Sequence, residues 1–271
     1  MGTIDLAAYC ARIGYSGPRT PTIETLRALH ALHPAAIPFE NIDVLLGRTI
    51  DLSPAAVDAK LIHGRRGGYC YEQNGLFKRA LAALGFFVEG LGARVLWQLP
   101  DDAPPRPKTH MALRVTIDGV PWLADVGFGG CVPTMPLRLD TTDEQQSAHE
   151  IFRITADGDD ALVAAKLDDR WAPLYRLNPA VMLDVDYELG NWFVSSHPQS
   201  HFRQRLMVSR VTSEARTTLQ YGQLTVRRPD QSVERTQLDA AGIETALADI
   251  FGLPVDPEWR PILARMAVSG L

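Results

Sequence analysis

Residues 65–77 read RRGGYCYEQNGLF, a paired-glycine turn that runs directly into a helical pattern. Apolar residues at helical spacing indicate the helix, and they are Leu76, Phe77, Ala80, Leu81 and Leu84, with Gly85 closing it. Cys70 is therefore expected near the helix N-terminus. Unpaired backbone N–H groups and the positive end of the helix dipole favour a thiolate there, and they also suit an oxyanion. The turn predicts a cysteine nucleophile, although a lone cysteine can equally be a small buried hydrophobic residue.

A β-hairpin is predicted around Asp118-Gly119, because Asp-Gly is the strongest short hairpin signal. A two-residue turn sets the opposing pairs, which are Ile117 with Val120, Val115 with Trp122, Leu113 with Ala124 and Met111 with Val126. One face of the hairpin is then wholly apolar, and a slip of one residue would scatter these apolar residues over both faces. The other face places His110 diagonally opposite Asp125, within reach of its side chain.

The His110 and Asp125 pair has both a structural and a catalytic interpretation. Buried polar groups generally find partners, so a cross-strand pair of this kind can be purely structural. Together with Cys70, however, the two residues complete a set of nucleophile, base and orienting acid that recurs on unrelated folds. The sequence does not by itself bring Cys70 to His110.

Four separated motifs resemble the arylamine N-acetyltransferase family. They are IPFENID at 37–43, RGGYC at 66–70 followed by Glu72 and Asn74, Thr109-His110 with DVGFGG at 125–130, and SSHPQSHF at 195–202. The resemblance covers residues 1 to about 203 by motif and the remainder only by length. It implies a papain-like cysteine-enzyme site with Cys70 as the acetyl-accepting nucleophile, His110 as the base and Asp125 as the orienting acid.

The resemblance also implies the ligands. Acetyl-CoA is the expected donor, and its pantetheine arm is expected to contact Thr109, Gly127, Phe128, Gly129 and Gly130. The expected acceptor is an arylamine or arylhydrazine, with O-acetylation of arylhydroxylamines as a related reaction. The expected acceptor pocket is aromatic and comprises Phe39, Tyr69, Tyr71, Phe128, His201 and Phe202. The alternative for the glycine run is a plain loop that binds no ligand. The alternative for the aromatic residues is that they belong to the hydrophobic core.

The expected mechanism is ping-pong transfer through an acetyl-cysteine intermediate, with xenobiotic metabolism as the role. A cysteine amidase or hydrolase with the same three residues is the first alternative, since water can replace the amine as acceptor. A ligand-binding module in which Cys70 is only structural is the second.

The composition of the chain argues against several other classes of protein. The chain has 271 residues, of which 46% are hydrophobic and 22% charged, enough for a large core. The chain has no long apolar run, and its N-terminus lacks a basic segment followed by an apolar one. We therefore expect a cytoplasmic protein without membrane contact. The three cysteines form no C-x-x-C pair, so we expect Cys10 and Cys131 to be packing residues and no zinc or other metal to be bound.

Charge points to small-molecule partners. The net charge of −5 argues against broad nucleic-acid binding, which needs a basic face. Local cations remain available for an anionic ligand such as coenzyme A, and the candidates are Arg106 and Lys108 before His110 and Arg203 and Arg205 after His201.

The predicted fold class is α+β, with a helical bundle over 1–85, a central antiparallel β-barrel over 86–203 and an α/β lid over 204–271. Helix starts are expected at Thr20-Pro21 and Ser53-Pro54, the second ending at Gly64. Besides the hairpin, strands are predicted at 88–97, 151–155, 161–166, 192–195, 206–211 and 217–226, and a last helix at 238–251.

Two further pairs of residues carry predictions. Glu40 and Arg66 each lie in a motif with little other use for a charge, so we expect a buried ion pair that braces the cysteine turn. His30 and His33 lie three residues apart before Pro34. We interpret them as charges that favour the C-terminus of a helix rather than as metal ligands.

Overall fold

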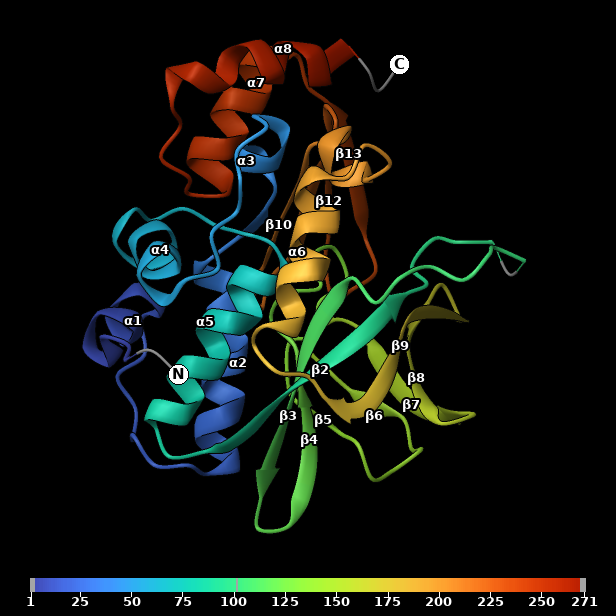
Figure 1. Ribbon diagram of the computed structural model, residues 1–271. Helices are drawn as coiled ribbons and strands as arrows, with labels where there is room; N and C mark the ends of the chain where they lie inside the picture. The colour runs from blue at the N-terminus through green and yellow to red at the C-terminus, as the bar shows by residue number, and fades with distance from the viewer. Residues whose placement is uncertain (1–2, 101, 269–271) are drawn as a thin grey trace.

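The computed structural model, which describes residues 3–100 and 102–268, is a mixed α+β fold. The N-terminal helices (blue to cyan) lie beside the larger sheet, and the C-terminal helices (red) lie at the top of the view (Figure 1). Its α-helices are α1 (Leu6–Ile13), α2 (Ile23–Ala36), α3 (Ile42–Leu45), α4 (Pro54–Val57), α5 (Cys70–Ala83), α6 (Asp186–Ser196), α7 (Ala240–Thr245) and α8 (Arg260–Val268). Shorter helical turns are η1 (Asp58–His63), η2 (His201–Arg203), η3 (Ala246–Ile250) and η4 (Pro257–Trp259). Within the described ranges, no helix combines the length and apolar character needed to cross a membrane.

The larger of two antiparallel sheets is the predicted barrel. Its eight strands follow the order β5-β4-β3-β2-β9-β8-β7-β6. They are β2 (Phe87–Val95), β3 (His110–Ile117), β4 (Val120–Ala124), β5 (Leu137–Arg138), β6 (Gln145–Gln146), β7 (Ile151–Asp157), β8 (Asp160–Leu167) and β9 (Arg170–Val181). The side chain of Gln145 joins the two edges, since it accepts from Arg138 N at 2.7 Å and donates to Arg138 O at 3.0 Å. The barrel is therefore nearly closed.

The smaller sheet joins the two ends of the chain. Its strands are β1 (Phe39–Glu40), β10 (Met207–Val211), β11 (Arg216–Gln220), β12 (Gln223–Arg227) and β13 (Val233–Gln237), hydrogen-bonded in that order. Since β1 lies between α2 and α3, the C-terminal sheet is anchored on the segment that precedes the cysteine turn.

The predicted hairpin is confirmed in register. The β3 and β4 pairs include Ile117 with Val120, Val115 with Trp122, and Leu113 with Ala124. Positive φ angles of 50° at Asp118 and 79° at Gly119 form the turn, which explains the Asp-Gly sequence. The predicted apolar face packs on the N-terminal helices through Met111, Leu113, Val115, Ala124 and Val126. The opposite face contributes Ala112 and Leu123 to the barrel core, so β3 is buried on both sides.

Helix boundaries agree with most of the predicted caps. The Ser53 side chain caps α4, and the helix continues through η1 to Gly64 as predicted. The α2 helix begins two residues later than predicted, because Thr22 rather than Thr20 accepts from the Thr25 N–H. The last predicted helix is observed as α7 and η3, capped by Asp239, with Gly252 just beyond it at a φ of 66°.

Several strand predictions needed correction. The single strand predicted at 217–226 is two antiparallel strands, β11 and β12, joined by a turn at residues 221–222. The predicted strand at 192–195 is wrong, because these residues end helix α6, whose buried side includes Tyr187, Val194 and Ser195 at helical spacing. A segment of only four residues, rich in aromatic and β-branched side chains, does not distinguish the alternating pattern of a strand from the periodicity of a helix. The sequence reading also missed β9, which contains Pro173 at a register shift opposite β8, where a missing N–H is tolerated.

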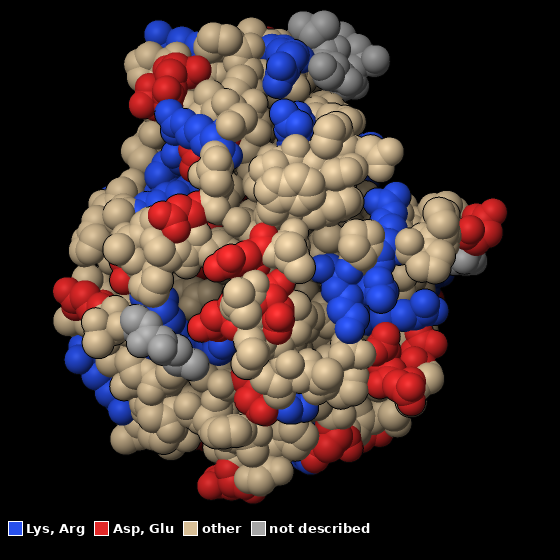
Figure 2. All heavy atoms as spheres, in the orientation of Figure 1, with Lys and Arg blue, Asp and Glu red and all other residues tan. Residues whose placement is uncertain are grey.

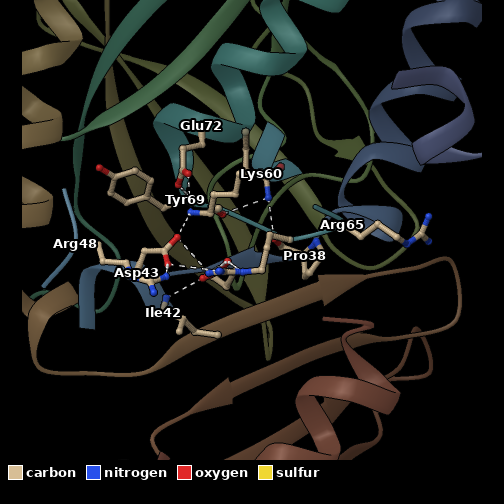
Figure 3. Close-up of polar contacts among 12 residues, drawn as sticks. Pro38, Ile42, Asp43, Arg48, Lys60, Arg65, Tyr69 and Glu72 are labelled. Carbon is tan, nitrogen blue, oxygen red and sulfur yellow. Dashed lines mark hydrogen bonds and ion pairs between the residues drawn. The ribbon is translucent and has the colours of Figure 1, made fainter. Parts of the chain in front are cut away.

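A cluster of ionic side chains braces the turn before α5 (Figure 3). The guanidinium of Arg66 contacts Glu40 at 2.7 Å and Asp43 at 3.2 Å. The ammonium of Lys60 contacts both Asp43 and Glu72 at 2.7 Å. These contacts bear out the predicted pair of Glu40 and Arg66 and extend it into a network. The Arg66 guanidinium also lies over the Trp259 ring at 4.6 Å, so the network joins the turn to the C-terminal helices.

Replacing Arg66 with alanine should lower the free energy of unfolding by about 3 kcal/mol, because it leaves the buried Glu40 carboxylate without its main countercharge. Urea unfolding followed by circular dichroism measures the loss. Arg48→Ala is the matched control, since Arg48 is 46% exposed and should cost less than about 1 kcal/mol. Equal stability of Arg66→Ala and the wild type would show that the network does not brace the fold.

Candidate active site

Close backbone contacts position Cys70. A Cβ at Gly67 would lie 2.0 Å from the backbone oxygen of Pro38, so this glycine is required sterically. A Cβ at Gly68 would lie 2.6 Å from Glu72 Oε2 and would displace that carboxylate. The Glu72 carboxylate also accepts a hydrogen bond from Tyr69 N at 3.0 Å. The turn therefore delivers Cys70 as the first residue of α5, where it is 4% exposed.

The structure brings Cys70, His110 and Asp125 together. His110 Nε2 lies 2.7 Å from Asp125 Oδ2, as the hairpin predicted. Cys70 Sγ lies 3.7 Å from the carbonyl oxygen of Thr109, the residue before His110, and the Cys70 side chain is close enough to the imidazole to raise the pKa of His110. Because Nε2 faces the carboxylate, Nδ1 is the ring nitrogen left for sulfur. The fold thus brings Cys70 near His110, which the sequence could not establish.

Asp125 has no exposure to solvent, and protein donors satisfy its carboxylate. Its Oδ1 accepts from Asn74 Nδ2 and from Gly127 N, both at 2.9 Å. Its Oδ2 accepts from the Tyr175 hydroxyl at 3.0 Å, besides facing His110. These donors fix both oxygens and orient the carboxylate toward the imidazole.

Charge pairing overcomes the cost of burial at this site. Burial disfavours the charged imidazole, but the Asp125 carboxylate and its hydrogen bond, together with Cys70, raise the pKa of His110 to about 10. Burial likewise opposes ionisation of Asp125, yet His110 and the hydrogen bonds from Asn74 and Gly127 hold the pKa of that carboxyl below its usual value. The pair is therefore an imidazolium and a carboxylate at neutral pH.

The glycine run after Asp125 packs against protein as well as facing the site. A Cβ at Gly127 would lie 2.9 Å from Cys70 Cα, so this glycine lets the loop touch the cysteine helix. Gly129 has a φ of 81° and lies against the Phe39 ring, at 3.4 Å from its would-be Cβ. Intramolecular packing thus accounts for these two glycines before any ligand is considered.

The predicted aromatic residues fall into two groups. Phe128 packs against His110 and Tyr175, with ring centroids 5.2 and 5.1 Å away. The Phe202 ring contacts Phe39 at 6.2 Å and Tyr69 at 6.0 Å. The second group continues from Tyr69 to Tyr71 at 5.7 Å, and from Phe202 to His201 at 4.4 Å. The two groups are close to each other, because Gly129 follows Phe128 in the chain and lies against the ring of Phe39.

A cavity of about 730 Å³ lies along the other side of α5, between α4 and α6. Its walls include Tyr71, Met111 and Tyr187. Of the predicted site residues that the structure describes, only Tyr71 borders this cavity. The hydroxyl of Tyr69 donates to Asn191, another wall residue, so the cavity is linked to the residue that precedes Cys70.

His30 and His33 correct the sequence interpretation. Both are fully buried, and burial as the main cause lowers the pKa of His30 to about 4 and that of His33 to about 3. They are neutral hydrogen-bonding groups rather than charges at a helix end. His30 Nε2 accepts from Asp125 N at 3.1 Å, whereas His33 bridges Tyr9 at 2.9 Å and Gln73 at 2.7 Å. In the described part of the chain, no group of three His, Cys, Asp or Glu side chains could hold a metal ion.

Sequence reasoning did not assign roles to several residues around the site. Asn74 lies one helical turn after Cys70, so helical spacing could have placed it on the same face. Gln73 donates to the carbonyl oxygens of Pro38 at 2.8 Å and Gly68 at 3.2 Å, which no spacing rule foretells. Tyr175 lies on β9, the strand that was missed, and its contact with Asp125 depends on barrel closure.

Comparison with known proteins assigns the chain to a family. A family model described as N-acetyltransferase matches residues 22–260. The arylamine N-acetyltransferase of Mycolicibacterium smegmatis is 44% identical over 269 residues, covering 97% of this chain and 98% of that protein. The arylamine N-acetyltransferase of Escherichia coli K12 is 41% identical over 250 residues, covering 92% and 88%.

Solved structures agree with the sequence comparison. The arylamine N-acetyltransferase of M. tuberculosis superposes with a TM-score of 0.92 at 40% identity, over 97% of this chain and 99% of that one. The Mycobacterium marinum enzyme in complex with CoA has a TM-score of 0.92 at 43% identity, over 98% and 99%. Family model, relatives and architecture concur: the chain is an acyltransferase that belongs to the arylamine N-acetyltransferase family.

Proposed function

We propose that the chain transfers the acetyl group of acetyl-CoA to arylamines and arylhydrazines through an acetyl-cysteine at Cys70. The observation that carries the proposal is the closeness of Cys70 to a His110 ring whose Nε2 lies 2.7 Å from Asp125 Oδ2. This grouping supports the papain-like cysteine-enzyme site that the sequence resemblance implied. The CoA complex of the M. marinum relative supports CoA as the carrier of the acetyl group.

The reaction divides into two half-reactions. In the first, the Cys70 thiolate attacks the thioester carbonyl, the bond from carbon to the CoA sulfur breaks, and CoA leaves with a proton from His110. In the second, the amine nitrogen attacks the acetyl-cysteine, the bond from carbon to Sγ breaks, and His110 takes the proton of the amine. CoA leaves before the amine reacts, so the kinetics are ping-pong.

The acceptor is proposed to be aromatic for two reasons. Aromatic amines are largely unprotonated at neutral pH, so their lone pair attacks without a separate deprotonation. The rings of Phe39, Phe202, Tyr69 and Phe128 lie close to the cysteine turn and the imidazole, and they can stack on such a ring. O-acetylation of arylhydroxylamines belongs to the same proposal, because a Salmonella typhimurium relative at 39% identity is named for both reactions. Modification of foreign aromatic amines is the corresponding role.

We assign the pantetheine arm to the loop between Asp125 and β5. Thr109 O lies beside Cys70 Sγ, and Phe128 packs on the His110 ring, so both border the reacting sulfur. Gly129 and Gly130 follow on the same loop. Residues 204–268 are proposed as a lid over this region, and the last three residues of the predicted lid, 269–271, lie outside the described residues. The hydrogen bond from Arg216 of β11 to Gly130 O at 3.2 Å supports this proposal.

Brief exposure to acetyl-CoA without amine should add one acetyl group to the wild-type protein and none to Cys70→Ser. Intact-mass spectrometry reads the adduct directly, and an arylamine added afterwards should release it. The physical reason is that the nucleophile holds the acetyl group until an acceptor arrives. Absence of an adduct on the wild type would refute the acetyl-cysteine intermediate.

Replacing Asp125 with asparagine should lower kcat/KM for acetyl transfer by about 10³- to 10⁴-fold, because the amide favours the wrong imidazole tautomer. The Tyr175→Phe variant is the matched comparison, since it removes one donor to Asp125 but keeps the carboxylate. We expect about a tenfold loss or less from it. Steady-state kinetics with an arylamine measure both, and an Asp125→Asn variant within tenfold of wild type would exclude the orienting role.

The stability of the protein should depend on pH through His110. Its pKa in the folded state is about 10, against about 6.5 when unfolded, so its contribution is complete below pH 6.5 and is lost as pH rises to 10. Urea unfolding of the wild type should show a decline over this window, about 1.4 kcal/mol per pH unit for one proton. The His110→Gln variant should lack this component, and identical slopes for both proteins would contradict the ion pair.

A further inference from the structure

The cavity beside α5 has no part in the proposed chemistry. Its volume of about 730 Å³ lies within the range of small-molecule sites, roughly 300–1,000 Å³. Figure 2 shows a hollow between the positions that α4 and α6 have in Figure 1, and Asp and Glu side chains gather at its rim. The walls come from residues 49–57, from α5 and from residues 184–191, and Cys70 is not among the residues that line them. The fold thus encloses a space that is separate from the reacting sulfur.

The cavity and the sulfur belong to different faces of α5. Tyr71, Gly75 and Lys78 line the cavity, and their spacing of four and then three residues puts them on one face of the helix. Cys70 and Asn74 have the same spacing one residue earlier, about 100° away around the helix axis. A ligand in the cavity would therefore contact a different face of α5 from the one that carries the sulfur.

Gly75 leaves the helix wall of the cavity open. A Cβ at Gly75 would meet no atom of the surrounding described residues within 4 Å, so packing does not require a glycine there, in contrast to Gly67. Glycine inside a helix is less stable than alanine, because its backbone loses more conformational freedom on folding. The sequence nevertheless has glycine at this position of α5, where it keeps the cavity wide.

The inner walls of the cavity are apolar and aromatic. Five of the lining side chains are buried, and they are Ile50, Val57, Tyr71, Met111 and Tyr187. The rings of Tyr71 and Tyr187 contact each other, with centroids 5.9 Å apart. The interior therefore suits an apolar group, and an aromatic one can pack on the tyrosine rings.

Both cations of the cavity walls already have partners. Lys78 Nζ lies 2.7 Å from Asp184 Oδ1. The two Nη nitrogens of Arg79 donate to the two carboxylate oxygens of Asp58, at 2.5 and 3.1 Å. The side chains of Lys78 and Arg79 are only 10% and 9% exposed. The cavity therefore offers no unpaired positive charge to an anionic ligand.

Two carboxylates of the walls, in contrast, lack a cation. Asp51 and Glu188 are exposed, and neither forms an ion pair with any residue in 3–100 or 102–268. Negative charge also reaches the tyrosine side of the cavity. Burial is the main cause that raises the pKa of the Tyr187 hydroxyl, and the charges of Asp184 and Asp186 add to it. The rim thus carries negative charge that the protein leaves unbalanced, and a cationic ligand would balance it.

We propose that this cavity binds an alkylammonium cation with an apolar or aromatic body. Asp51 and Glu188 hold the ammonium from the two walls that α4 and α6 delimit, and the body fills the space beside Gly75. Such a ligand differs in class from the proposed acceptors. Arylamines are largely uncharged at neutral pH and gain little from carboxylates, whereas alkylamines are protonated and have no lone pair to attack an acetyl-cysteine. The cavity therefore selects the amines that the active site does not acetylate.

Phenethylamine, which is protonated at neutral pH, is the probe. An NMR titration of the backbone amides of the full-length protein measures its Kd and locates its site. We expect saturable binding that shifts the amide signals of Gly75 and Glu188. Phenethyl alcohol has the same aromatic body without the charge, and its Kd should be about tenfold higher. Equal Kd values for the two compounds would overturn the assignment of a cation site.

Removing the unpaired carboxylates tests the charge of the rim. The Asp51→Asn/Glu188→Gln variant should raise the Kd for phenethylamine about tenfold. Its fold should persist, because asparagine keeps an oxygen that can accept from Ser53 N, at 2.8 Å in the wild type. Glu144→Gln/Glu214→Gln is the matched control, since it removes two exposed carboxylates that do not line the cavity. The control should bind with the wild-type Kd.

The Gly75→Leu variant tests the space without changing the charge. Its side chain would extend into the open volume, so saturable binding of phenethylamine should be lost. Leucine is a better helix former than glycine, and thermal unfolding should show a stability at least equal to that of the wild type.

Carbamidomethylation of Cys70 by iodoacetamide separates the cavity from the active site. The modified protein should bind phenethylamine with the wild-type Kd. Loss of binding on modification would place the probe at the active site and overturn the inference. Wild-type affinity in Asp51→Asn/Glu188→Gln or in Gly75→Leu would also overturn it, as would the absence of saturable binding to the wild type. None of these results bears on the acetyl adduct at Cys70, which decides the proposed function separately.

Discussion

A carboxylate removed from water must find all of its hydrogen-bond donors within the protein, and this requirement organises the site around Asp125. Its donors come from separate elements, namely Asn74 on α5, His110 on β3, Tyr175 on β9 and the backbone of Gly127. Each donor fixes the position of the element that carries it. Satisfying one buried charge therefore aligns the cysteine helix, the hairpin and the far wall of the barrel.

The cysteine turn depends on a second buried network, in which three carboxylates share two cations. Glu40, Asp43 and Glu72 contact Arg66 and Lys60, and this network braces the glycine turn (Figure 3). A neutral histidine also supports the turn. His33 hydrogen-bonds to Gln73, and Gln73 in turn donates to the carbonyl oxygen of Gly68. Cys70 is thus held by contacts that do not touch its sulfur, which leaves the sulfur available for chemistry.

The sequence predicted those parts of the site that local rules govern. The Asp-Gly turn and the alternating pattern gave the register that joins His110 to Asp125, and helical spacing gave the start of α5. The remainder depends on contacts between distant segments. Tyr175 could not be foreseen because its strand contains prolines, and the burial of His30 depends on the packing of α2 against Asp125, the residue that follows β4. Four residues at 192–195 were too few to distinguish a strand from the end of α6.

Strand β3 has a consequence for how the molecule gains and loses its structure. Its two faces serve different hydrophobic cores, Met111, Leu113 and Val115 packing on the helices and Ala112 on the barrel interior. If either core opened, one apolar face of β3 would be exposed to water while the opposite face stayed packed. Folding of the helical part and of the barrel is therefore cooperative across their boundary. The residues of the site are drawn from both parts, so the site is complete only when both cores are packed.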